Sequence, residues 1–287
     1  MTFSIVGADL ENGDWGVAVA SKFPAVGAVV PWAQAGIGAV ATQSWANTTY
    51  GPEGLALMGS GTPAKDALDH LVDADDHKPD RQAGFVDASG RAATFTGTGC
   101  SEWAGGVTGP GFAAQGNILT GPEVVSEMAS AFASAEGDLC DKLLAALLAG
   151  DAAGGDRRGR QSAALLVVRE KGGYDGWNDR YVDLRVDDHP AAATEMARLF
   201  AIWDDTMLVR NDPLLEPAPD LVTDLQRRLM ALGRFNGSIS GDYDVATRAG
   251  LEDFAGNYNL EGRLRKDDLI SQLLVREIRD LTPEIDD

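Results

Sequence analysis

The second residue of the chain carries a side chain that could act as a nucleophile. Thr2 opens an alternating, β-branched stretch (TFSIVGAD) and is small enough for the initiator Met1 to be removed. The chain would then begin with a hydroxyl and a free α-amine on one residue. Because the pKa of an α-amine is roughly 7.7–8.0, it can serve as the base of an N-terminal threonine nucleophile. The alternative is structural, since threonine is also a favoured strand residue.

Two further residues are expected beside Thr2. An Asn-Gly-Asp sequence at 12–14 is a strong hairpin signal between two apolar stretches. Pairing of residues 2–9 with 15–21 would bring Ser21 and Lys22 next to Thr2, and we predict catalytic roles for all three. A lysine there would disfavour protonation of the amine, while the Ser21 hydroxyl could relay a proton. Alternatively, Ser21 and Lys22 simply face water at a strand end.

A loop of glycines and arginines, residues 154–162 (GGDRRGRQS), forms a positive patch in an acidic chain. Guanidinium groups suit a carboxylate or a phosphate, so we expect this loop to hold the polar end of a substrate. The residues assigned to substrate binding are Asp156, Arg157, Gln161 and Ser162. The loop lacks the GK[ST] ending of a P-loop, so nucleotide binding is not predicted. An exposed loop whose arginines offset the surplus acids is the alternative.

Carboxamides end two of the expected strands. Asn117 closes the Gln-Gly-Asn sequence at 115–117, where a carboxamide and a backbone N–H can stabilise an oxyanion. We therefore predict Asn117 as a catalytic residue. Gln43 ends the stretch GIGAVATQ and is assigned to substrate binding or oxyanion support. Gly-Asn is also an ordinary turn sequence, which leaves a structural alternative.

The expected elements determine how these residues come together. Strands, then paired helices, then strands follow one another without the regular alternation of a doubly wound sheet. This order favours two antiparallel sheets stacked face to face with helices outside, so we predict an α+β, four-layer αββα sandwich. The expected strands are 2–9, 15–21, 26–32, 36–43, 81–86, 91–96, 103–108, 111–117, 162–169 and 181–186, and the helices are 52–60, 62–73, 122–135, 139–149 and 190–209.

A proline-rich stretch divides the chain. Residues 211–219 (NDPLLEPAP) contain three prolines, which indicate a linker. We predict a first domain over 1–211, a linker over 212–219, and a small all-α domain over 220–287. Its three helices are expected at 220–233, 244–254 and 266–280. A unit of about 65 residues can fold alone, if marginally.

The composition excludes several kinds of partner. A formal net charge of −20 disfavours nucleic acid and anionic membranes, which need basic patches. The two cysteines and three histidines show no metal-ligand spacing and no disulfide framework, so neither a metal nor an organic cofactor is expected. We expect no signal peptide and no membrane-spanning stretch, hence a cytoplasmic protein. A homo-oligomer is also expected.

Motifs in a fixed order resemble one protein family. They are TFSIV, GVAVASKFPAVGAVVPWAQAGIGAVATQ, YGPEGL, AAQGN, and AGGDRRGRQSAAL followed by LRVDDHP. Residues 1 to about 205 resemble a bacterial and archaeal family catalogued as a domain of unknown function and assigned to the N-terminal-nucleophile (Ntn) hydrolase superfamily. The resemblance implies the αββα fold of proteasome β subunits, with Thr2 as nucleophile. Proteasome-type members carry a lysine on a later strand, whereas residues 29–34 contain none here, so Lys22 is the nearest basic candidate.

The tail resembles a second family. LQRRL at 225–229, Leu232-Gly233 and ATRA at 246–249 are similar to the three-helix peptidoglycan-binding module. The central turn of that module is usually Asp-Gly, and here it is Ser240-Gly241. This resemblance implies binding of peptidoglycan fragments. A helical interaction or dimerisation module is the alternative.

Three hypotheses about function follow. The leading one is an amidohydrolase that acts on a small amide or peptide-like substrate through Thr2, with an acyl ester that water then hydrolyses. The second is a binding or scaffold protein that keeps the Ntn fold without turnover, which a retained Met1 would favour. The third is a cell-wall-associated binder that uses the tail.

Overall fold

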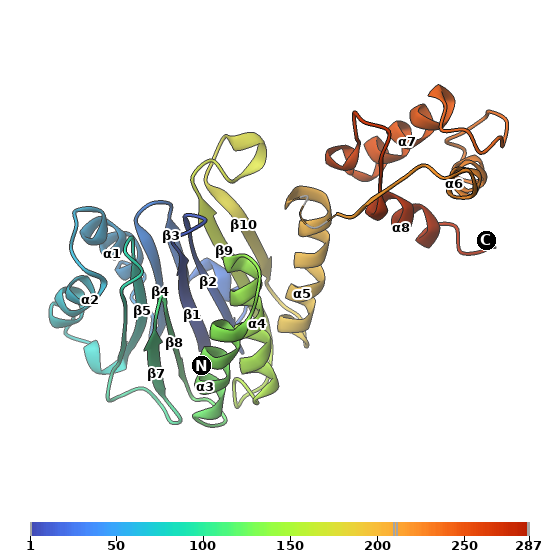
Figure 1. Cartoon of the computed structure of the whole chain (residues 1–287). Helices are drawn as coiled ribbons and strands as arrows, with labels where there is room; N and C mark the ends of the chain where they lie inside the picture. Colours follow the sequence, from blue (N-terminus) through green and yellow to red (C-terminus); the bar gives the residue numbers. More distant parts are fainter. Residues whose placement is uncertain (1, 209, 211, 286–287) are drawn as a thin grey trace. The chain divides into compact units, whose positions relative to one another are not determined.

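The chain forms an α+β structure with antiparallel sheets, as the order of its elements predicts. The computed structural model describes residues 2–208, 210 and 212–285, and these contain eight α-helices (Figure 1). The chain divides into two compact units, Met1–Phe200 and Ala201–Asp287. Each unit has a core of its own, and each is described by itself below.

The larger sheet of the N-terminal unit holds six strands in the order β10-β9-β2-β1-β8-β7. Their bounds are β1 Thr2–Asp9, β2 Asp14–Ser21, β7 Gly105–Gly109, β8 Phe112–Asn117, β9 Ser162–Arg169 and β10 Arg180–Val186. The β1–β2 hairpin is confirmed, with Phe3 opposite Ala20. Gly13 takes a φ of 70° in its turn, a conformation that glycine adopts without strain. On the other side of β1, Thr2 pairs with Asn117 of β8.

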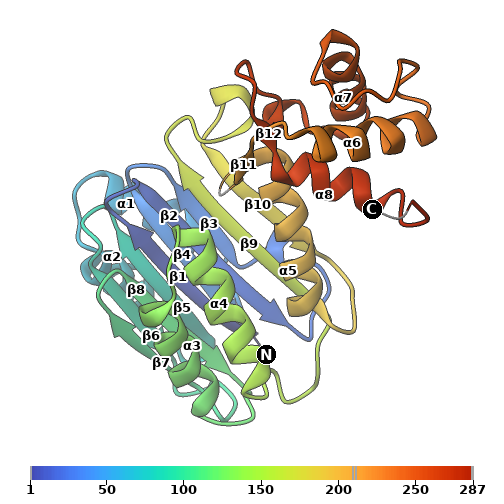
Figure 2. The same cartoon turned by 45° about the vertical axis from the view of Figure 1, so that its right-hand side comes forward.

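The smaller sheet holds four strands in the order β3-β4-β5-β6. Their bounds are β3 Pro31–Gln34, β4 Gly38–Ser44, β5 Arg81–Asp87 and β6 Ala92–Thr96. The two sheets face each other, because β1 packs on β4 and β5 packs on β8. Helices α1 (Tyr50–Gly59) and α2 (Ala64–Asp73) cover the outer face of the smaller sheet, and α3 (Glu123–Ser134) and α4 (Leu139–Ala152) cover that of the larger one (Figures 1 and 2).

Small and β-branched residues fill most of the space between the sheets. Val6, Val17, Val19 and Val86 are fully buried there, together with several alanines. Since alternate residues of a strand face opposite sides, even-numbered residues of β1 face the smaller sheet, while odd-numbered ones such as Phe3 face α4. Burying each valine side chain contributes about 1.5–3 kcal/mol. At the Thr2 end of β1 this apolar layer gives way to polar side chains.

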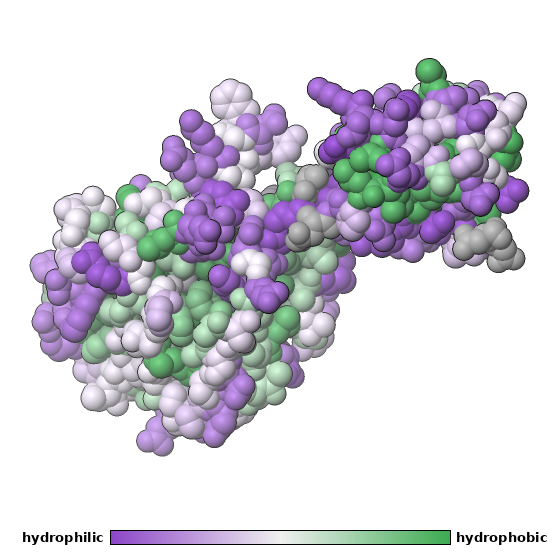
Figure 3. Space-filling view, in the orientation of Figure 1, coloured by the Kyte–Doolittle hydropathy of each residue, from purple (hydrophilic) through white to green (hydrophobic). Residues whose placement is uncertain are grey.

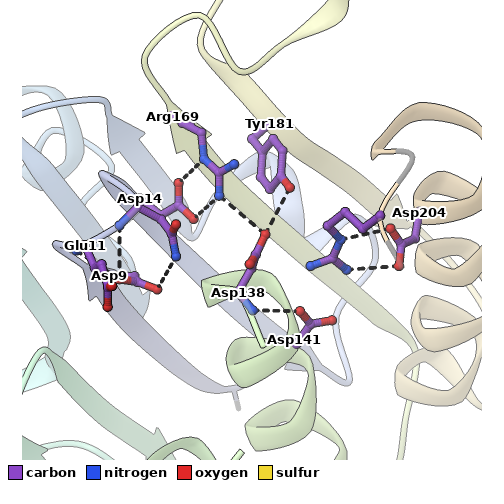
Figure 4. A network of polar contacts seen from close by, with 10 residues as sticks. Asp9, Glu11, Asp14, Asp138, Asp141, Arg169, Tyr181 and Asp204 are labelled. Carbon is purple, nitrogen blue, oxygen red and sulfur yellow. Dashed lines mark hydrogen bonds and ion pairs between the residues drawn. The ribbon is translucent and has the colours of Figure 1, made fainter. Parts of the chain in front are cut away.

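An ion-pair network joins the larger sheet to the start of α4 (Figure 4). Arg169 of β9 donates to both oxygens of Asp14, at 2.6 and 2.8 Å. It also reaches Asp138 at 3.5 Å, which accepts a hydrogen bond from the Tyr181 hydroxyl at 3.1 Å. Asp138 caps α4 in a capping box with Asp141. Burial raises the pKa of the Asp14 carboxyl, and Arg169 opposes that shift.

The C-terminal unit is built from three α-helices after the end of α5 (Ala192–Trp203). They are α6 (Pro219–Ala231), α7 (Val245–Tyr258) and α8 (Gln272–Asp280), and a two-residue strand β11 (Leu214–Leu215) pairs with β12 (Ile270–Ser271). Leu225, Phe254 and Ile278 lie at the centre of the core. On the face of this unit shown in Figure 3, hydrophobic residues gather within a hydrophilic surround.

Several expected element bounds were wrong. The strand expected at 26–32 is a 3-10 turn, Val26–Ala28, followed by β3, because Ala25 has a φ of 50° and Pro31 lacks an N–H. The helix expected to reach 209 gives way after Trp203 to a π-helical turn at Asp204–Leu208. The expected linker contains β11, and the last helix begins at 272 rather than 266. Residues 1, 209, 211, 286 and 287, which include Met1 and several expected domain ends, lie outside the described residues. None of the described helices is long and apolar enough to cross a membrane.

Candidate active site

Thr2 lies at the first position of β1, between the ends of β2 and β8. Only 6% of the residue is exposed. Its Oγ1 lies 3.1 Å from the Oγ of Ser21, the last residue of β2. The hairpin register produces this contact, because both residues are at facing strand ends and point to the same side of the sheet. The structure therefore brings two predicted site residues, Thr2 and Ser21, together.

Gln43 connects Thr2 to the smaller sheet. Its Nε2 donates to the Thr2 carbonyl oxygen at 3.3 Å and to Gln82 Oε1 at 2.8 Å. Its Oε1 accepts a hydrogen bond of 2.6 Å from the Ser4 hydroxyl. These contacts use both ends of the carboxamide, so Gln43 holds the backbone of Thr2 in place.

Gln82 of β5 is the centre of the polar layer between the sheets. Its Oε1 also accepts from Asn117 Nδ2 at 2.8 Å, and its Nε2 donates to the Gly116 carbonyl at 2.7 Å and to Thr96 Oγ1 at 2.9 Å. Gln82 and Asn117 are at most 1% exposed. Leaving a buried polar group unpaired costs about 1–3 kcal/mol, so this bonding fixes where Asn117 sits. Gln82 was not predicted as a site residue, although a glutamine on the buried face of an alternating strand was the available signal.

Gln115 completes the layer. Its Nε2 donates to the Ser4 hydroxyl at 2.7 Å, while its Oε1 is buried without a hydrogen-bond partner among the described residues. A Cβ on Gly84 would lie 2.1 Å from that oxygen. Only glycine at position 84 therefore leaves room for the Gln115 carboxamide.

A cavity of about 560 Å³ opens beside Thr2. Two of its lining residues, Ser44 and Ile118, have positive φ angles of 70° and 51° although neither is glycine. Such conformations cost of order 1–3 kcal/mol and gather at functional sites. The described residues that line the cavity are Thr2, Phe23, Val26, Val29, Val30, Gln43, Ser44, Trp45, Ala46, Arg81, Gly99, Ser101, Asn117, Ile118 and Arg158.

Arg81 builds one wall of this cavity. Its Nε lies 2.9 Å from Asp75, and it donates to the carbonyl oxygen of Trp45. Asp75 also accepts hydrogen bonds from Asn47 at 3.0 Å and from the Tyr50 hydroxyl at 3.1 Å. The hydrogen bond from Arg81 is the main reason that the pKa of Asp75 lies far below its usual range. The Arg81–Asp75 ion pair therefore adds to the β4–β5 ladder, in which Ser44 pairs with Arg81, in holding the wall that carries Trp45.

The arginine-rich loop contributes Arg158 to the cavity, not the predicted Arg157. Asp156 is 6% exposed and accepts from the backbone N–H groups of Arg158 at 2.8 Å and of Lys22 at 2.7 Å. The Arg158 guanidinium lies 3.2 Å from the same carboxylate. Asp156 thus accepts from the N–H of the residue two positions later, as in an Asx-turn. This turn orients Arg158 toward the cavity. Arg157 is exposed, and its backbone N–H donates to the Ile118 carbonyl at 3.3 Å.

Six predicted site residues lie outside the cavity lining: Ser21, Asp156 and Arg157, described above, and Lys22, Gln161 and Ser162. The Lys22 side chain is exposed, and its Nζ donates to the Arg160 carbonyl at 3.3 Å. Lys22 lies in the bend after β2, so the strand pairing that places Ser21 beside Thr2 does not extend to it. Gln161 binds Asp188 at 3.1 Å. Ser162 is fully buried; it donates to the Phe23 carbonyl and accepts from the N–H of Val26 at 3.1 Å, which shapes the loop behind the cavity.

A second large cavity of the N-terminal unit holds none of the predicted site residues. A cavity of about 570 Å³ lies between β3 and the β9–β10 pair and is lined in part by Trp32 and Arg185. Among residues 2–208, 210 and 212–285, no group of three or more His, Cys, Asp or Glu side chains could hold a metal ion. Cys100 lies beside the Thr2 cavity, with its Sγ 3.6 Å from Ser44 Oγ, and burial raises the pKa of its thiol.

Fold and site together define an α+β protein with two facing antiparallel sheets and a buried threonine at a polar cavity. Residues 2–196 match the family of unknown function DUF1028, and the chain belongs to this family. It is similar to the crystal structure of protein SPO2555 from Silicibacter pomeroyi, also of DUF1028, with 32% identity and a TM-score of 0.65. The similarity covers 71% of this chain and 89% of that one. No curated protein matches the chain.

Proposed function

We propose that the chain is an N-terminal-nucleophile amidohydrolase built on the four-layer αββα fold of that superfamily. The observation that carries the proposal is the Thr2 hydroxyl, which lies at the wall of the cavity and 3.1 Å from the Ser21 hydroxyl. Helices on the outer faces of both sheets support the superfamily assignment. Removal of Met1 would place an α-amine on the same residue as this hydroxyl.

The reaction is acyl transfer in two steps. Thr2 Oγ1 attacks the amide carbonyl carbon while its proton passes to the Thr2 α-amine, and negative charge develops on the carbonyl oxygen. The C–N bond then breaks, the leaving nitrogen takes the proton from the Thr2 ammonium, and an acyl ester remains on Oγ1. Water attacks this ester with the amine again as base. A carboxylic acid leaves and Thr2 is restored.

The neighbours of Thr2 divide the remaining tasks. The Ser21 hydroxyl, 3.1 Å from Thr2 Oγ1, relays or stabilises the proton. Asn117 Nδ2 uses one N–H on Gln82, and the second N–H is the oxyanion donor. Gln43 is a positioning residue because its carboxamide is already bonded at both ends. The sequence analysis assigned to Lys22 the role of keeping the Thr2 amine unprotonated. Arg81 and Arg158 line the cavity and fill this role instead, because nearby positive charge disfavours a protonated amine.

A second candidate function concerns the C-terminal unit, as a module that binds peptidoglycan fragments. Gln226 of α6 accepts from the N–H groups of Ser240 and Gly241 at 2.9 and 3.0 Å and donates to Thr247 at 2.8 Å. The residues that resemble the peptidoglycan-binding module therefore support the turn between α6 and α7. Sedimentation with purified peptidoglycan tests this function. A full-length protein that stays in the supernatant would leave the alternative, a helical interaction module.

The test of the amidohydrolase is an intact mass measured before and after treatment with an electrophilic β-lactone. Loss of Met1 and one adduct that maps to Thr2 are expected, with no adduct on Thr2→Ala. Ser101→Ala is the matched control, because it removes another hydroxyl from the same cavity and should label fully. If Met1 is retained, or if wild-type Thr2 never labels, the amidohydrolase hypothesis is rejected in favour of a binding or scaffold protein.

A further inference from the structure

The charge of the Thr2 cavity is opposite to that of the chain. The sequence has 44 acidic and 24 basic residues, yet the charged side chains among the described residues that line this cavity are two arginines, Arg81 and Arg158. On the basis of the proposed function, we infer that the substrate is an amide that carries both a carboxylate and an apolar group. Arg158 is the residue that selects the carboxylate.

The acids that pair with these arginines lie behind them. The side chains of Asp75 and Asp156 are 7% and 2% exposed, and neither lines the cavity. Each ion pair therefore presents its positive member to the cavity and its negative member to the protein interior. An anionic group in the cavity would meet guanidinium groups first, in a site partly screened from water where charges interact more strongly.

The two arginines are suited to different tasks. Arg81 is 16% exposed and bonds to Asp75 and to the Trp45 carbonyl, so it is a fixed part of the wall. The Arg158 side chain is 46% exposed, and its Nε and Nη2 bond to Asp156. A guanidinium has five N–H donors in a planar fork and binds carboxylates in a bidentate manner. Arg158 is therefore the one placed to bind a solute.

One part of the cavity wall is apolar. Phe23 and Trp45 are 48% and 75% exposed, unusually high values for large hydrophobic side chains, and both line the cavity. Val26, Val29 and Val30 line it as well. A volume of about 560 Å³ falls in the range of small-molecule sites. An apolar group packed on these side chains, with a carboxylate on Arg158, fits a small acylated amino acid.

Calorimetric titration of a matched pair of ligands tests this inference. N-phenylacetylglycine has the carboxylate and the aromatic group, and N-phenylacetylglycinamide differs only in lacking the charge. Full-length Thr2→Ala serves as the host, so that neither ligand is consumed. Because a hydrogen bond to a charged group is the interaction removed, we expect the carboxylate to bind about 10- to 100-fold more tightly than the carboxamide. That ratio should approach one when Arg158→Gln is added.

Arg157→Gln, in the same host, is the matched control, because this exposed neighbour is outside the cavity lining and should leave the ratio unchanged. Equal affinity for the two ligands, or no binding of either, would overturn the inference. So would competition by inorganic phosphate at the concentration at which N-phenylacetylglycine saturates. These outcomes do not depend on labelling of Thr2, so failure of the substrate class and failure of the hydrolase are separate results.

Discussion

Replacing Gln82 with leucine should destabilise the N-terminal unit strongly, although the two side chains are similar in size. The change removes the acceptor of Gln43 Nε2 and Asn117 Nδ2 and the donor to the Gly116 carbonyl. Asn117 lines the cavity and can turn to water, which leaves about two buried groups without these partners. At about 1–3 kcal/mol for each, the free energy of unfolding should fall by about 2–6 kcal/mol. That is a large part of the ~5–15 kcal/mol typical of a domain.

Urea unfolding followed by tryptophan fluorescence measures this loss, because five of the six tryptophans lie in Met1–Phe200. Thr96→Val is the matched control: it deletes one partner of Gln82 on the less buried side and should cost about 1 kcal/mol. Labelling of Thr2 by the β-lactone should slow in Gln82→Leu, since Gln43 loses one of its supports. A loss of less than about 1 kcal/mol would show that the polar layer does not hold the site in place.

Two further predictions concern the cavity wall and the space beside Gln115. Folding lowers the pKa of Asp75, so its ionised carboxylate adds to the free energy of unfolding. This stabilisation is complete above the ordinary aspartate pKa of about 3.9 and is lost as the pH falls below it. Asp75→Asn should therefore lower the free energy of unfolding by about 3 kcal/mol at pH 7. The difference from wild type should narrow below about pH 4, while Asp73→Asn, an exposed control, should have little effect at any pH; a difference that does not vary with pH would contradict the pairing. Gly84→Ala should destabilise by about 1–3 kcal/mol in urea unfolding, because its Cβ would overlap the Gln115 carboxamide. Gly256→Ala in α7, where a Cβ meets nothing within 4 Å, should not destabilise, and equal effects at the two glycines would refute the steric reason.

The sequence was sufficient where local rules operate. The Asn-Gly-Asp turn set the β1–β2 register, and that register alone places Ser21 beside Thr2. The α+β class followed from the order of elements. The rule stops at the end of the strand: Lys22 follows β2, and its exposed side chain bonds to the Arg160 carbonyl instead of reaching Thr2.

Contacts between distant segments could not be read in the same way. Gln82 acts through Asn117 and Gln43, which lie 35 and 39 residues away in the chain. Loop residues have no periodicity, so nothing in the repeated arginines distinguished Arg158 from Arg157. The role of Ser162 depends on the path of the loop through Phe23 and Val26, which only the folded chain defines.

The buried carboxamide layer also restricts how this site can change during evolution. Gln43, Gln82 and Asn117 are at most 1% exposed and bond to one another, so a single substitution removes hydrogen bonds from buried partners. Replacing this polar layer by apolar side chains without loss of stability would require several simultaneous substitutions on three strands, β4, β5 and β8. Single substitutions are tolerated more easily at the exposed cavity residues Phe23 and Trp45. We therefore expect the ligand preference of this site to diverge more readily than the frame that holds Thr2.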